Sequence, residues 1–70
     1  MWIVDDDGDM FNTDLYFKIF FTDAKTIILE PLKDHQFPEE FKLSLELNEE
    51  ERLMRYYDLV EKLTGERIDG

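Results

Sequence analysis

Four aspartates near the N-terminus come closest to a metal-binding pattern, and they are Asp5, Asp6, Asp7 and Asp9. Clustered carboxylates are preferred ligands of calcium, and a twelve-residue calcium loop also needs glycine at position six and glutamate at position twelve. If Asp5 is position one, Met10 and Tyr16 occupy those two positions. The pattern therefore predicts a solvated acidic turn, and we expect neither a metal site nor another cofactor.

Candidates for catalysis are few. His35 is the only histidine and Ser44 the only serine, so a Ser-His-Asp arrangement would have to use both. However, the alternating pattern around Ser44 places this serine on the outward side of a strand, away from a catalytic pocket. The three glycines are too far apart to form a phosphate-binding loop. We therefore expect a protein that is not an enzyme.

The charge balance restricts the class of partner. The chain has 18 Asp and Glu against 8 Lys and Arg, a formal net charge of -10. Direct binding to nucleic acid or to an anionic membrane requires a basic surface, so both are disfavoured and a basic protein partner is favoured. The chain has no cysteine, no signal-peptide pattern and no apolar run near the ~20 residues of a membrane span. We expect a cytoplasmic protein.

Length and composition predict one folded domain over residues 1–70. A hydrophobic share of 43% is too high for a disordered chain, despite the net charge. A domain of this size buries a smaller fraction of its surface than a larger one, so association into a homodimer is an alternative source of stability.

The longest aromatic and β-branched run, residues 15–22, is predicted to form the central strand. With a period of two, its odd-numbered residues form a wholly apolar face. The opposite face carries Tyr16, Lys18 and Phe20. A face of this kind is a candidate interaction surface unless another element covers it.

Further strands are predicted on both sides of this run. The turn-forming pair Asp7 and Gly8 predicts a hairpin between strands at about 1–4 and 9–11. A strand at about 26–31 pairs with the run at 15–22, and residues 41–47 alternate without interruption, which predicts a fifth strand.

One helix is predicted at about 49–64. Asn48 is a favourable N-cap, Glu51 stands at the capping-box position and Gly65 is a natural end. The order of elements predicts an α+β fold: an antiparallel sheet of four to five short strands with one C-terminal helix packed on one face.

The N-terminal segment Trp2-Ile3-Val4-Asp5, then Gly8 and Asn12-Thr13-Asp14, resembles the opening of small, mostly uncharacterised acidic proteins. These occur in Firmicutes-type bacteria and in their phages and mobile elements. They also have short strands followed by one acidic-started helix. The resemblance implies a context in which small acidic proteins bind and block a host enzyme or defence complex.

The sequence leads to a hypothesis of a non-enzymatic protein-binding module, most concretely a phage or mobile-element inhibitor of a host protein. The expected binding residues are Tyr16, Lys18 and Phe20 on the open sheet face, joined by Asp5, Asp6, Asp7 and Asp9 if the partner is basic. One alternative is a DNA mimic that fills a nucleic-acid-binding groove with its acidic surface. Another is a small homodimeric structural module.

Overall fold

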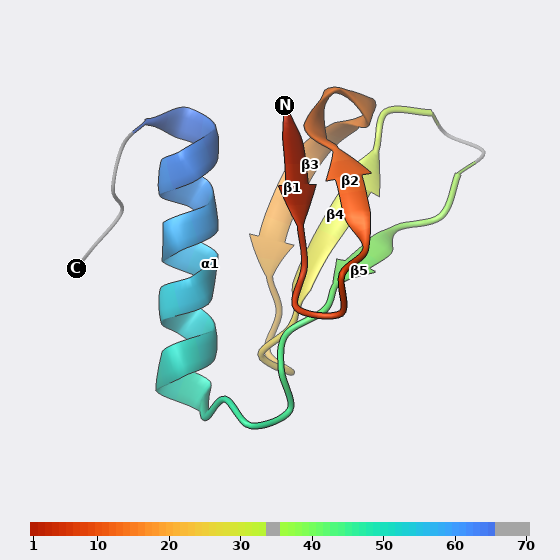
Figure 1. The fold of residues 1–70 in the computed structure, drawn as a ribbon. Coiled ribbons are helices and arrows are strands. Elements are labelled where there is room, and N and C mark those ends of the chain that lie inside the picture. Colours follow the sequence, from red (N-terminus) through yellow and green to blue (C-terminus); the bar gives the residue numbers. More distant parts are fainter. Residues whose placement is uncertain (34–35, 66–70) are drawn as a thin grey trace.

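A computed structural model describes residues 1–33 and 36–65. The predicted α+β class is confirmed, with antiparallel strands followed by a C-terminal helix (Figure 1). The elements are β1 (Trp2–Val4), β2 (Met10–Asn12), the 3-10 helix η1 (Thr13–Leu15), β3 (Tyr16–Phe21), β4 (Ile27–Pro31), β5 (Glu39–Phe41) and α1 (Glu49–Thr64). His35, which the sequence analysis considered and rejected as a catalytic residue, lies outside the described residues.

In the part of the chain that the structure describes, five strands form two antiparallel sheets. Strands β1 and β2 make the predicted N-terminal hairpin, in which Ile3 lies opposite Phe11 and Val4 opposite Met10. The connecting loop is closed by the backbone N–H of Asp5, which donates to the carbonyl of Asp9 at 3.0 Å. Gly8 has a φ of 89°, a conformation that favours glycine. The turn signal in the sequence therefore marked the hairpin correctly.

The second sheet has the order β3-β4-β5, so the prediction that residues 15–22 form the central strand was wrong. The central strand is β4, whose Ile27 and Leu29 are fully buried. Full burial of such side chains contributes ~1.5–3 kcal/mol each. The aromatic run forms the edge strand β3, because aromatic content alone does not tell whether a strand has one neighbour or two.

Strand β3 contains an irregularity that changes which face its side chains occupy. Tyr16 lies opposite Pro31 and Lys18 opposite Glu30, so the register shifts between Tyr16 and Lys18. Phe17 is the extra residue of this bulge and is 62% exposed. The regular alternation predicted through residues 15–22 therefore fails at its start, where Leu15 belongs to the 3-10 helix.

The predicted strand at 41–47 was largely wrong. Strand β5 ends at Phe41, and the chain beyond it leaves the sheet. Phe41 and Leu43 are buried as the alternation predicted, but Leu45 is 94% exposed. The physical reason is that the backbone N–H groups of Lys42 and Ser44 bond to side chains of the hairpin loop instead of to another strand.

Helix α1 has the predicted bounds and caps. Asn48 and Glu51 form a reciprocal capping box, and Gly65 ends the helix in the left-handed conformation with a φ of 78°. The side chain of Leu59 is its buried contact with the core. The local sequence signals were sufficient here because a capped helix end depends on neighbours in the chain.

One hydrophobic core joins the hairpin, the three-stranded sheet and the helix. Its buried residues are Ile3, Phe11, Ile27, Leu29, Phe41, Leu43 and Leu59. In Figure 1 the hairpin lies in front of the three-stranded sheet and α1 runs alongside them. Because side chains alternate along β4, the hairpin and the helix both pack on the face that carries Ile27 and Leu29. Within residues 1–33 and 36–65, no helix or strand covers the other face of this sheet.

Candidate functional site

Asp5, a predicted partner-binding residue, is buried and holds the hairpin loop together. Asp5 is only 5% exposed to solvent. One carboxylate oxygen accepts the N–H groups of Asp7 at 3.1 Å and Asp9 at 2.8 Å, and the other accepts the N–H of Lys42 at 3.1 Å. Hydrogen bonds to an ionised acceptor are stronger than those between neutral groups. Asp5 is therefore a structural residue.

Asp6 also makes contacts within the chain. Its carboxylate accepts the backbone N–H of Ser44 at 2.9 Å and pairs with the guanidinium of Arg55 on α1. By contrast, Asp7 and Asp9 are exposed. Asp6 is also exposed as a residue, but its side chain is only 21% exposed and is held by Arg55, whereas no such ion pair is found for Asp7 and Asp9 among the described residues. In the described part of the chain, no cluster of three or more His, Cys, Asp or Glu residues could hold a metal ion.

Tyr16 is separated by the bulge from the residues with which it was grouped. It packs against the core, with its ring 6.3 Å from that of Phe11 in an edge-to-face arrangement. Its hydroxyl donates to the carboxylate of Glu39. Burial, together with the hydrogen bond to Glu39 and the negative charge of Glu39, raises the pKa of Tyr16 to about 12. Tyr16 therefore links β3 to Glu39 of β5 across the central strand β4, and the structure does not bring it to the open face.

Lys18 and Phe20 do lie together on the open face of the three-stranded sheet. The Lys18 ammonium is 5.0 Å from the centroid of the Phe20 ring, which is within cation–π range. Phe20 lies opposite Ile28 on β4, and Lys18 lies opposite Glu30. This open face therefore has a half-buried aromatic and aliphatic pair with a cation and a carboxylate beside it.

The hairpin carries a second apolar surface that sequence reasoning missed. Trp2 is 56% exposed, Val4 is 51% exposed and Met10 is 62% exposed. These three side chains form the outer face of the hairpin, on the opposite side from Ile3 and Phe11. The alternation Trp2-Ile3-Val4 was the available signal, because only one side of a two-stranded sheet can face the core.

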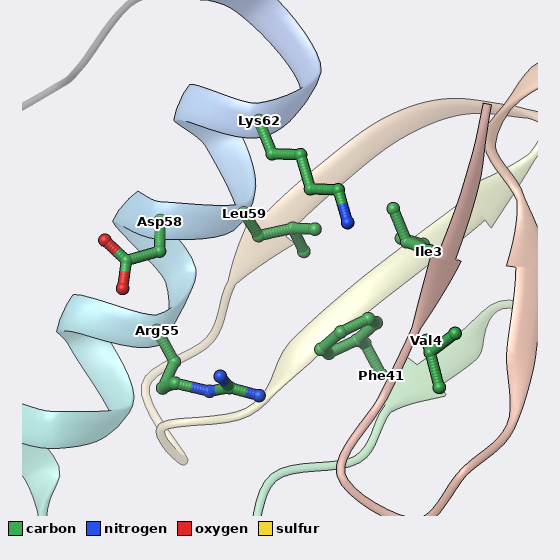
Figure 2. A pocket seen from close by; sticks show the side chains of 7 residues that line it. All are labelled: Ile3, Val4, Phe41, Arg55, Asp58, Leu59 and Lys62. Carbon is green, nitrogen blue, oxygen red and sulfur yellow. The ribbon is translucent and has the colours of Figure 1, made fainter.

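A groove lies between this hairpin and the helix (Figure 2). Its volume is about 140 Å³, and apolar side chains of Ile3, Phe41 and Leu59 line it. Figure 2 shows the side chains of Arg55 and Lys62 extending from α1 toward β1, whereas the Asp58 carboxylate is turned away.

The charges around the groove balance. The rim holds the cations Arg55 and Lys62 and the carboxylate Asp58, and Asp6 pairs with Arg55. These two cations and two carboxylates sum to a formal charge of zero, although the Asp58 carboxylate points away from the groove. The apolar lining fits a small uncharged group better than a charged one.

Comparison with protein-family models, with curated proteins and with solved structures found no match to this chain. Within residues 1–33 and 36–65, no helix has both the length and the hydropathy needed to cross a membrane.

Proposed function

We propose that the protein is a non-enzymatic protein-binding module and, most concretely, an inhibitor from a phage or mobile element that binds a host enzyme or defence complex. The observation that carries the proposal is the one-sided covering of the three-stranded sheet. The helix and the hairpin share one face, and the other face presents Phe20 and Ile28 with Lys18 beside them.

The chemistry of this open face fits protein recognition. A solvated sheet face usually carries polar residues, whereas Phe20 and Ile28 lie at neighbouring positions in adjacent strands here. Aromatic anchors with charged neighbours are typical of the few residues that dominate binding energy at an interface. The cation of Lys18 and the carboxylate of Glu30 can orient a partner by hydrogen bonds at the edge of the apolar pair.

The two alternatives have less support. A DNA mimic needs a row of carboxylates that are available to a partner. In the hairpin loop, Asp5 is buried and Asp6 is paired with Arg55. Only the carboxylates of Asp7 and Asp9 in this loop are therefore available for binding. A homodimer would bring two chains of net charge -10 together, and like charges oppose association. We therefore place inhibition through the open face first.

The experiment is affinity capture from a bacterial lysate with the tagged chain and three variants. Phe20→Thr keeps a strand-forming residue and Lys18→Glu leaves the core untouched, and both should weaken binding of the captured partner at least tenfold. Met54→Thr, on the helix and 45% exposed, is the matched control and should bind as the parent does.

Charge and salt separate the alternatives. A DNA mimic predicts that Asp7→Asn with Asp9→Asn abolishes capture and that affinity falls steeply with salt. Unchanged binding by both Phe20→Thr and Lys18→Glu, in variants shown to be folded by circular dichroism, would refute the open-face assignment. A stable dimer that captures nothing would favour the homodimeric module.

A further inference from the structure

We propose that the outer face of the β1–β2 hairpin is a second docking surface, and that its occupant is a basic, extended segment of a partner protein. The surface consists of Trp2, Val4 and Met10, each more than half exposed. Val4 and Met10 lie directly opposite each other, and Trp2 lies on the same side of β1 as Val4. Three exposed apolar side chains on one short hairpin form a contiguous patch of the kind that marks interaction sites.

The charges beside this patch argue for a basic occupant. At one end, the Asp14 carboxylate forms an ion pair with the N-terminal amine at 3.7 Å, and its side chain is 79% exposed. Along the β2 side, Met10 shares a hollow with Asp9, Glu39 and Glu40, and among the described residues Lys42, paired with Glu40, is the one cation that lines it. Carboxylates therefore outnumber cations around the patch, as they do in the whole chain.

Trp2 supplies a specific contact for a cationic side chain. The face of an indole ring is the best aromatic partner for the guanidinium of arginine or the ammonium of lysine. The carboxylates of Asp9, Glu39 and Glu40, which lie beside Met10 in the same patch, would attract the cations of such a segment. A second copy of this chain is a poorer occupant because it would bring the same carboxylates against these.

The groove beside Val4 extends the surface. Val4 belongs to the patch and also lines the groove, whose walls are Ile3, Phe41 and Leu59. An engineered cavity of ~150 Å³ accepts a benzene molecule, so the groove's volume of about 140 Å³ is enough for one apolar side chain. A segment that places a cation on Trp2 can thus insert an aliphatic side chain next to Val4.

Trp2 is the only tryptophan and makes the test site-specific. In the free protein at low salt, caesium ions should quench Trp2 fluorescence more, and iodide ions less, than each quenches a free neutral tryptophan derivative, because nearby carboxylates attract cations. The probe is an amidated peptide of alternating arginine and leucine, and the control is the same peptide with glutamate in place of arginine. The arginine peptide should shift Trp2 emission to shorter wavelength and protect it from acrylamide.

Variants locate the binding. Met10→Asn keeps the Trp2 reporter and should weaken the arginine peptide at least fivefold, whereas Met54→Asn on the helix should bind as the parent does. Phe20→Thr and Lys18→Glu should also bind normally, because this surface is independent of the open sheet face. The two proposals can therefore fail separately.

Three results would overturn the inference. The first is protection of Trp2 by the glutamate peptide as strong as by the arginine peptide. The second is unchanged affinity of Met10→Asn for the arginine peptide. The third is a stable dimer by light scattering in which Trp2 is already shielded, since a second copy would then occupy the patch.

Discussion

Replacement of Asp5 by asparagine tests the central role of this buried carboxylate. The side chain accepts three backbone N–H groups, two at one oxygen and one at the other. An asparagine has one oxygen acceptor, so either the N–H of Lys42 or those of Asp7 and Asp9 would face an amide NH₂. Losing a hydrogen bond to a charged acceptor costs ~1.5–3 kcal/mol, and the bonds that remain would be weaker because the acceptor is neutral.

We therefore expect Asp5→Asn to lower the free energy of unfolding by about 3 kcal/mol. Proteins have ~0.05–0.15 kcal/mol of stability per residue, so a chain of 70 residues has roughly 4–10 kcal/mol. The substitution would remove a large part of it. With a slope of about 1 kcal/mol per M in urea, the unfolding midpoint should fall by roughly 3 M.

Urea unfolding followed by far-UV circular dichroism is the assay, with Asp7→Asn as the matched control. Asp7 lies in the same loop and is exposed, so Asp7→Asn makes the same change in charge and should alter stability by less than ~0.5 kcal/mol. If Asp5→Asn were as stable as the parent chain, or if both variants lost the same stability, the assigned role of Asp5 would be refuted.

Three further predictions concern local contacts. Arg52→Met should destabilise the fold by about 2 kcal/mol in urea unfolding, because the guanidinium donates to three backbone carbonyls at 3.1–3.3 Å, and Arg52→Lys should recover only part of this. Asn48→Ala removes the N-cap and should cost ~1 kcal/mol in the same assay, an effect that would be absent if the capping box were unimportant. Tyr16, with its pKa raised from 10.0 to about 12, should ionise later than an ordinary tyrosine in an ultraviolet titration, and Tyr16→Phe should remove this late step. Because the folded pKa of Tyr16 is the higher one, its contribution to stability is complete below pH 10 and should be lost as the pH rises from 10 to 12.

The helix and the first hairpin were predictable because their signals are local. The capping box at Asn48 and Glu51 and the stop at Gly65 act within a few residues of one another. Likewise, Asp7 and Gly8 mark the loop between β1 and β2. Such contacts depend on neighbours in the chain, so a single sequence is enough to place them.

The end of β5 could not be predicted because its cause lies far away in the sequence. Alternation continues to Leu47, but the N–H groups of Lys42 and Ser44 are taken by carboxylates 37 and 38 residues earlier. A pattern of apolar residues gives the side that faces the core, and Leu43 is indeed buried. It does not reveal which acceptor will bond the backbone.

The candidate site was predictable in part for similar reasons. Lys18 and Phe20 were correctly placed on one face, since alternation holds beyond the bulge. Tyr16 was grouped with them because the bulge, which inserts one extra residue, cannot be recognised from the amino-acid composition of the strand. Asp5 and Asp6 looked like solvated charges, and only the folded arrangement gives them N–H donors and Arg55 as partners.

The link between the hairpin loop and the chain after β5 also has a consequence for the order of folding. The hairpin and α1 each form from contacts close in sequence, whereas Asp5 with Lys42 and Asp6 with Ser44 close loops of more than thirty residues. Closing loops of this length is slow relative to forming a local turn. The amide hydrogens of Lys42 and Ser44 should therefore gain protection from exchange only when the hairpin docks. The time at which they become protected during refolding should report this last step of assembly.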